Sequence, residues 1–188
     1  MGDDRPAAPG TSSGRAGSAV LVPVPQAEPI VSAWRARHDP VAAAGVPAHI
    51  TLIVPWLPPD AIRPADLDDL AEVAATTASW DFALTEMAWF GRRVLWLVPE
   101  PDEPFRALTL RLAERFGTPP WEGAFADVVP HLTVGHTTGD PEALERVEKK
   151  LSAKLPVRCR AGELWVMVAA DRQWKVRARC PLARPTAR

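Results

Sequence analysis

The chain has 188 residues, of which 47% are hydrophobic and 24% are charged. This length suits one domain, and this composition predicts a soluble globular protein. The formal net charge of -1 provides no overall positive field for nucleic acid, although 22 lysines and arginines leave room for a local basic groove. No segment approaches the roughly 18 consecutive apolar residues of a membrane-spanning helix. We therefore expect a cytoplasmic protein without membrane contact, with a monomer as the default state.

The chain begins with a segment, residues 1–17, whose glycine, serine, proline and alanine content predicts a disordered tail. After this tail, the spacing of apolar residues alternates between the periods of strands and helices. The elements predicted in this half are a strand at 18–24, a helix at 28–37, a buried strand at 48–55, a helix opened by Pro64 and a half-buried strand at 80–88.

The second half of the chain repeats the order of the first. Its predicted elements are a strand at 93–99, a helix capped by Asp102, a strand at 130–137, a helix opened by Asp140-Pro141, a strand at 157–169 and a final strand at 173–181. Each half thus contains strand, helix, strand, helix and strand, a repeat of pattern and not of residue identity. We expect one bilobal domain at 18–182, with lobes at about 18–90 and 91–182, and a short tail at 183–188.

The chain contains two cysteines, Cys159 and Cys180. A hairpin that turns near Asp171–Arg172 would place Cys180 opposite about Glu163 and away from Cys159. We therefore expect both cysteines to be reduced.

Two predicted strands carry the same short motif, a histidine followed two residues later by a threonine. His49 and Thr51 form the first pair, and His131 and Thr133 form the second. Residues i and i+2 of a strand point to one face, so each histidine projects together with its threonine. The two pairs occupy equivalent places in the two halves. If the halves pack about a pseudo-twofold axis, both pairs face one central cleft.

This arrangement suits displacement at phosphorus. One neutral imidazole can remove a proton from the attacking water or hydroxyl, while the other, protonated, delivers a proton to the leaving oxygen. Histidine is the side chain that performs both tasks near neutral pH. The threonine hydroxyls can donate hydrogen bonds to the non-bridging oxygens, and the chemistry requires neither a metal nor a cofactor.

The segments Ala48-His49-Ile50-Thr51-Leu52 and Pro130-His131-Leu132-Thr133-Val134 resemble the paired motifs of the 2H phosphoesterase superfamily, particularly its bacterial 2'-5' RNA ligase-like branch. The resemblance extends from about Ser18 to Leu182. It implies an α+β bilobal fold in which duplicated units form two antiparallel-rich sheets that line a central cleft. It also implies metal-independent hydrolysis, or reversible ligation, of cyclic or 2'-linked phosphodiesters. Catalysis would fall to His49 and His131, and phosphate binding to Thr51 and Thr133.

Two further residues are possible substrate contacts, Trp121 in the loop before the second motif and His136 after it. Family members commonly carry an arginine at the position of His136, and the chain has no tyrosine, so we expect hydrolysis of a nucleotide or short RNA-derived phosphodiester ahead of RNA ligation. On a continuous strand, His136 would face away from His131 because the offset between them is odd. A zinc site built from histidines lacks a cysteine or carboxylate at ligand spacing. The remaining alternatives are 2'-5' RNA ligation, a non-catalytic module that binds a nucleotide or phosphometabolite, and recruitment of the cleft to unrelated biosynthetic chemistry.

Overall fold

The computed structural model describes residues 17–119, 127–137 and 141–184. The strands are β1 (Ser18–Pro23), β2 (His49–Ile53), β3 (Trp80–Phe90), β4 (Val94–Glu100), β5 (Leu132–His136), β6 (Val157–Ala161), β7 (Glu163–Ala170) and β8 (Gln173–Pro181). The helices are α1 (Glu28–His38), α2 (Pro40–Ala43), α3 (Pro64–Ala75), α4 (Glu103–Phe116) and α5 (Pro141–Ser152), with short 3-10 turns η1 (Pro25–Ala27) and η2 (Pro59–Ala61). The predicted strands and helices occur in the predicted order, except that the strand predicted at 157–169 is divided in two and α2 is an additional helix.

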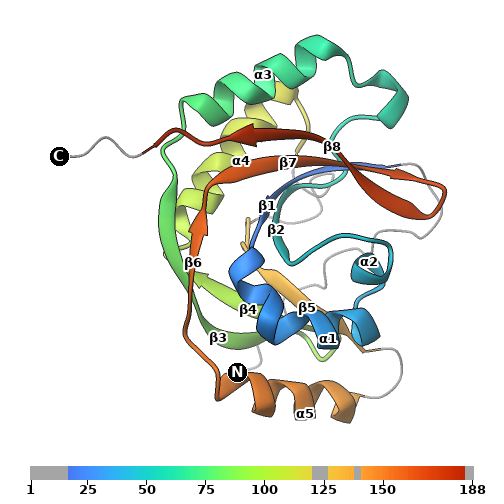
Figure 1. The fold of residues 1–188 in the computed structure, drawn as a ribbon, viewed down its shortest axis with the longest axis vertical. Helices are drawn as coiled ribbons and strands as arrows, with labels where there is room; N and C mark the ends of the chain where they lie inside the picture. Colours follow the sequence, from blue (N-terminus) through green and yellow to red (C-terminus); the bar gives the residue numbers. More distant parts are fainter. Residues whose placement is uncertain (1–16, 120–126, 138–140, 185–188) are drawn as a thin grey trace.

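The strands form two four-stranded sheets, with the orders β2-β1-β7-β8 and β5-β4-β3-β6 (Figure 1). Every pair of neighbouring strands is antiparallel, which confirms the predicted α+β class with antiparallel sheets. Neither sheet is built from one half of the sequence. Strand β3 comes from the predicted first lobe but pairs with β4, and β7 comes from the second lobe but pairs with β1. The predicted lobe boundary at residues 90 and 91 is therefore not the boundary between the sheets.

Two helices also pack on strands from the opposite half of the sequence. Helix α1, from the first half, packs on β5, whereas α4, from the second half, packs on β2. Helices α3 and α4 lie together at one end of the molecule, and α1 and α5 lie together at the other (Figure 1). Each histidine strand is thus supported by a helix from the opposite half of the sequence.

One large hydrophobic core joins the helices to the sheets. It includes fully buried residues from strands of both sheets, such as Val22, Ile50, Leu97 and Leu132. Two smaller clusters lie apart from it, one around Leu21 and Met167 and the other around Phe90, Val94 and Trp96. Leu21 pairs with Thr51 and Trp96 pairs with Thr133, so each small cluster shares a sheet face with one motif.

The structure differs from the sequence-based prediction near Gly162. The predicted strand at 157–169 is two strands, β6 and β7, which belong to different sheets. Gly162 is exposed and separates them. A run of strand-forming residues predicts extended backbone but does not identify the sheet that each part joins.

The predicted C-terminal hairpin is confirmed. Asp171 and Arg172 have φ angles of 52° and 63°, as a two-residue type I′ turn requires. Cys180 pairs with Leu164, one residue from the expected partner, and both cysteines are buried and free.

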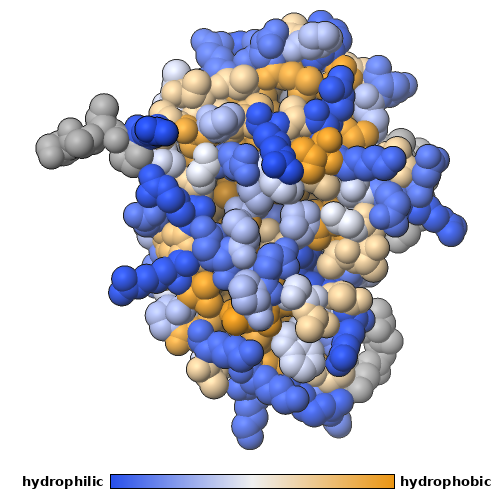
Figure 2. Space-filling view, viewed as in Figure 1, coloured by the Kyte–Doolittle hydropathy of each residue, from blue (hydrophilic) through white to orange (hydrophobic). Residues whose placement is uncertain are grey.

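Hydrophilic side chains cover most of the face in Figure 2, and hydrophobic surface is limited to separate patches. Within the described ranges, no helix is long and apolar enough to cross a membrane.

Candidate active site

Both motifs lie on edge strands that contact one another. His49 and Thr51 are on β2, Thr133 is on β5, and His131 immediately precedes β5. Strands β2 and β5 are the terminal strands of their sheets, and residues of the two strands are in contact. The fold therefore brings together two segments that are about 80 residues apart in the sequence.

Strand β2 contains a bulge directly after its motif. Leu21 pairs with Thr51 and the adjacent Val20 pairs with Ile53, so Leu52 is an extra residue in β2. A bulge of this kind bends the strand and changes the face to which the following side chains point.

Strand β5 contains the same irregularity at the equivalent position. Trp96 pairs with Thr133 and the adjacent Leu95 pairs with Gly135, so Val134 is the extra residue. In both strands the bulge comes immediately after the motif threonine. The repeated pattern in the sequence thus corresponds to a repeated backbone geometry.

The bulge in β5 corrects the expected orientation of His136. Val94 on β4 pairs with His136, and Trp96 pairs with Thr133. Val94 and Trp96 are two residues apart, so their side chains point to the same face of β4. Their partners on β5 therefore also point to that face. His136 therefore shares a face with Thr133. The simple alternation fails because Val134 adds one residue to the strand. A positive charge on His136 lowers the pKa of His131, consistent with this placement.

The two motif histidines make matching hydrogen bonds. His49 Nδ1 lies 2.7 Å from the carbonyl oxygen of Pro47, and His131 Nδ1 lies 2.8 Å from that of Val129. In both cases the acceptor is two residues earlier in the chain. Because a carbonyl oxygen only accepts, Nδ1 carries the proton and the neutral ring holds its lone pair on Nε2. Both imidazoles are thus fixed in the same tautomer.

Burial lowers the pKa of both imidazoles. Burial is the largest of the factors that together bring the pKa of His49 to about 4, and the charges of Arg35 and His131 act in the same direction. The Pro47 carbonyl and Asp39 act in the opposite direction. Burial also lowers the pKa of His131, against a raising effect of the Val129 carbonyl. A charge on His131 is among the factors that lower the pKa of His49, so the two motif histidines lie within electrostatic range of each other.

Aromatic side chains surround His131. Phe90 and Trp96 contact its ring edge-on, with centroid distances of 4.9 and 5.8 Å. Phe90 also stacks on Trp96 at 4.8 Å. These contacts, together with the Nδ1 hydrogen bond, restrict the orientation of the imidazole.

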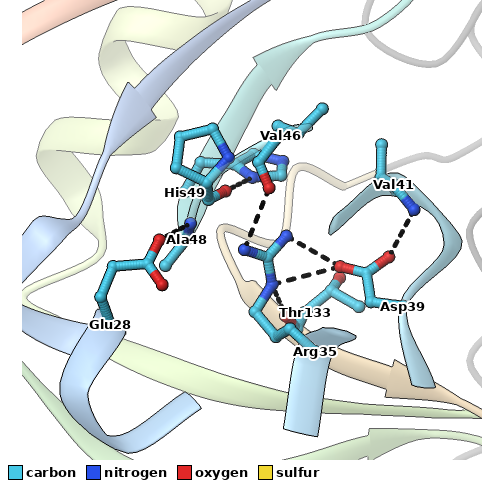
Figure 3. A network of polar contacts seen from close by, with 9 residues as sticks. Glu28, Arg35, Asp39, Val41, Val46, Ala48, His49 and Thr133 are labelled. Carbon is cyan, nitrogen blue, oxygen red and sulfur yellow. Dashed lines mark hydrogen bonds and ion pairs between the residues drawn. The ribbon is translucent and has the colours of Figure 1, made fainter. Parts of the chain in front are cut away.

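A buried ion pair at the C-terminal end of α1 links β5 to the segment that leads into β2 (Figure 3). Arg35 is only 2% exposed, and its Nη2 lies 2.8 Å from the fully buried carboxylate of Asp39. Its Nε donates to the carbonyl of Thr133 at 3.1 Å, and its Nη1 donates to that of Val46 at 3.3 Å. Arg35 therefore contacts β5 and also the segment that leads into His49.

Two further contacts strengthen this network. Asp39 Oδ1 accepts a hydrogen bond from the backbone N–H of Val41, which caps α2, a helix that the sequence did not predict. Glu28 Oε1 accepts from the backbone N–H of Ala48, next to His49, at 2.6 Å. Helix α1 thus supports the first motif from both of its ends.

Sequence reasoning missed the Arg35–Asp39 pair. The available signal was their spacing of four residues, which places opposite charges on one helix face. Such pairs are usually solvent-exposed, so spacing alone does not distinguish a buried one.

Trp56 and Trp121 flank the two motifs in the sequence, and the structure describes only Trp56. Trp56 is buried and packs edge-on against Phe116 at 5.1 Å, as a structural residue does. Trp121 lies outside the described residues. Among the residues that the structure describes, no group of three histidine, cysteine, aspartate or glutamate side chains is placed to hold a metal ion.

Two antiparallel sheets bring the paired His-x-Thr segments together at their edges, which is the arrangement expected of the 2H phosphoesterase superfamily. The chain belongs to the 2'-5' RNA ligase superfamily, which it matches over residues 22–173. This finding confirms the resemblance found in the sequence motifs.

Solved structures share the fold at low sequence identity. Escherichia coli LigT complexed with ATP has a TM-score of 0.55 and 17% identity, covering 90% of this chain and 98% of LigT. A crystal structure described as a phosphoesterase has a TM-score of 0.56 and 16% identity, covering 90% of this chain and 99% of the other. TT0787 of Thermus thermophilus has a TM-score of 0.55 and 16% identity, covering 89% of this chain and 98% of TT0787. None of the curated protein sequences matches the chain.

Proposed function

We propose that this protein hydrolyses a cyclic or 2'-linked nucleotide phosphodiester without a metal, using His49 and His131 as the acid–base pair. The observation that carries this proposal is the matched geometry of the histidines. Each ring is fixed by an Nδ1 hydrogen bond to a carbonyl two residues earlier, so each directs its chemistry through Nε2. Two such imidazoles supply the base and the acid that the reaction needs.

The surroundings of the histidines differ, and this difference favours one direction of proton transfer. The charge of Arg35 adds to burial in holding His49 neutral, which suits the base that accepts a proton from the attacking water. Oxygen then bonds to phosphorus, and one ester P–O bond breaks. His131 in its protonated form gives its Nε2 proton to the leaving oxygen. The negative charge of the bound phosphodiester favours that protonated form.

Thr51 and Thr133 are proposed to hold the phosphate group. Each is half-buried and lies two residues after its histidine on the same strand. Their hydroxyls can donate hydrogen bonds to the non-bridging oxygens, where negative charge is held in the transition state.

The family and its ligands support a nucleotide as the substrate. LigT structures contain ATP, phosphate, 3'-AMP or NADP+. The net charge of -1 on this chain favours a small nucleotide over long RNA. Membership of the 2'-5' RNA ligase superfamily makes ligation the second candidate, because the same acid and base serve the reverse reaction.

The test is turnover of cyclic nucleotides, RNA ending in a 2',3'-cyclic phosphate and 2'-5'-linked dinucleotides, all with EDTA present. We expect hydrolysis by the wild-type protein and a loss of at least about 100-fold in His49→Ala and His131→Ala. His38→Ala is the matched control because it removes a histidine outside the pair.

Different results would contradict different parts of the proposal. Activity that needs added zinc would exclude the metal-independent reaction. Nucleotide binding without turnover by the wild-type protein would favour the binding module. Joining of RNA ends in preference to hydrolysis would favour the ligase.

A further inference from the structure

A row of side chains runs across the sheet that carries His49. Thr51 on β2 pairs with Leu21 on β1, Leu21 pairs with Trp165 on β7, and Trp165 pairs with Arg179 on β8. Residues directly opposite one another on neighbouring strands point to the same face. The row therefore starts at a proposed phosphate-binding residue and ends at the outer strand of the sheet.

The outer end of this row is a cationic platform, formed by Arg179 and Trp165. The guanidinium of Arg179 lies over the Trp165 ring, 4.3 Å from its centroid. Arg179 is exposed and Trp165 is half-buried. Trp165 is about two strand spacings, roughly 10 Å, from Thr51, which is the scale of a single nucleotide. The guanidinium covers one face of the ring, so a ligand that approaches over this face would meet the guanidinium first.

We propose that Arg179, supported by Trp165, forms the subsite on which the base of the substrate nucleotide stacks. This inference rests on the proposed function, because it places the scissile phosphate at Thr51. Guanidinium planes and aromatic rings both stack on nucleobases. The platform determines specificity and takes no part in the proton transfers.

The neighbouring residues favour a base over a second phosphate. Leu21 and Met167 form a buried apolar cluster on this face, and Trp165 packs against it, so the cluster holds the ring beneath Arg179 in place. Glu163, two residues before Trp165, lies on the same face of β7 and is half-buried. Its carboxylate would repel a phosphate, whereas it can accept a hydrogen bond from a base.

The test compares the binding of 3'-AMP and inorganic phosphate to the full chain by isothermal titration calorimetry. We expect wild-type protein to bind 3'-AMP more tightly than phosphate. Arg179→Ala should weaken 3'-AMP binding by roughly tenfold and leave phosphate binding within about twofold. Arg179→Lys should behave like Arg179→Ala, because it keeps the charge but loses the plane.

Lys175→Ala is the matched control. Lys175 is on the same strand but pairs with Val168, whose side chain points to the opposite face and packs against the main core. This variant should bind both ligands as the wild type does.

Three results would overturn the inference. The first is that the wild-type protein binds 3'-AMP and phosphate with equal affinity. The second is that Arg179→Ala weakens the binding of both ligands by the same factor. The third is that Arg179→Ala or Arg179→Lys binds 3'-AMP as tightly as the wild type. These measurements need no turnover, so a failure of the proposed hydrolysis would be seen separately in the activity assay.

Discussion

Arg35 on α1 donates a hydrogen bond to the main-chain carbonyl of Thr133, 98 residues later in the chain. The same guanidinium contacts the carbonyl of Val46, just before the first motif, and forms a buried ion pair with Asp39. One side chain therefore fixes the position of both motif strands. It also places a positive charge near His49 that lowers the pKa of this imidazole.

Replacement of Arg35 by methionine should destabilise the protein strongly. It would leave the Asp39 carboxylate buried without its partner, which costs about 3–5 kcal/mol of unfolding free energy. Urea denaturation measures this loss. Arg92→Met removes an ion pair to Glu145 in which the arginine is 79% exposed, and should cost less than about 1 kcal/mol. Equal effects of the two substitutions would contradict a structural role for Arg35.

The low pKa of His49 predicts a specific dependence of stability on pH. Above pH 6.5, His49 is neutral in both the folded and the unfolded chain, and its contribution is constant. Between about pH 6.5 and 4, the unfolded chain binds a proton that the folded chain does not, so stability falls as pH falls. The loss due to His49 is at most about 3 kcal/mol.

Denaturation of the wild type and His49→Gln between pH 7 and 4 tests this sign. The variant should lose less stability than the wild type as the pH falls. A His49 resonance that titrates near pH 6.5 in NMR spectra of the folded protein would refute the prediction.

His136 should influence the titration of His131. The positive charge of His136 lowers the pKa of His131, so His136→Asn should raise this pKa. NMR titration of the His131 ring measures the change. His38→Asn is the control, because the charge of His38 is not among the causes of the His131 shift. This variant should leave the titration midpoint of His131 unchanged. An unchanged midpoint in His136→Asn would show that the two rings do not interact.

Gly135 should tolerate no side chain. A Cβ atom at this position would lie 2.6 Å from the Cβ of His38 and 3.0 Å from Cδ2 of Leu144. Gly135→Ala should therefore cost about 1–3 kcal/mol of stability and lower activity by shifting β5. Gly162→Ala is the control, because a Cβ there has no neighbour within 4 Å. Thermal unfolding of both variants decides the matter, and similar melting temperatures would argue against close packing of α1 on β5.

The motif threonines should contribute to catalysis more than to stability. Thr51→Val and Thr133→Val keep the shape of the side chain but remove the hydroxyl donor. Each should lower kcat for a cyclic nucleotide by roughly 10- to 100-fold. Thr137→Val, which alters a hydroxyl that bonds main-chain carbonyls at the end of β5, should retain activity. Unchanged kcat in both motif variants would remove the threonines from the proposed mechanism.

Local patterns in the sequence determined the order of the elements and the two His-x-Thr pairs. Period-two alternation puts His49 with Thr51, and His131 with Thr133, whatever the rest of the chain does. The same motifs also identified the family. These features could be predicted because they depend on residues close together in the sequence.

The tertiary structure alone decided which elements meet. Strand β3 joins the sheet of β4, and β7 joins the sheet of β1, while β6 and β7 on either side of Gly162 belong to different sheets. The pairings of β7 with β1 and of β6 with β3 are between strands that lie far apart in the sequence, so local patterns do not reveal them. The bulge at Val134 reversed the expected orientation of His136, because an extra residue appears only in the register with β4. Arg35 is an ordinary helix residue by sequence. It becomes the link between the motifs only when the fold buries it between Asp39 and the carbonyls of Thr133 and Val46.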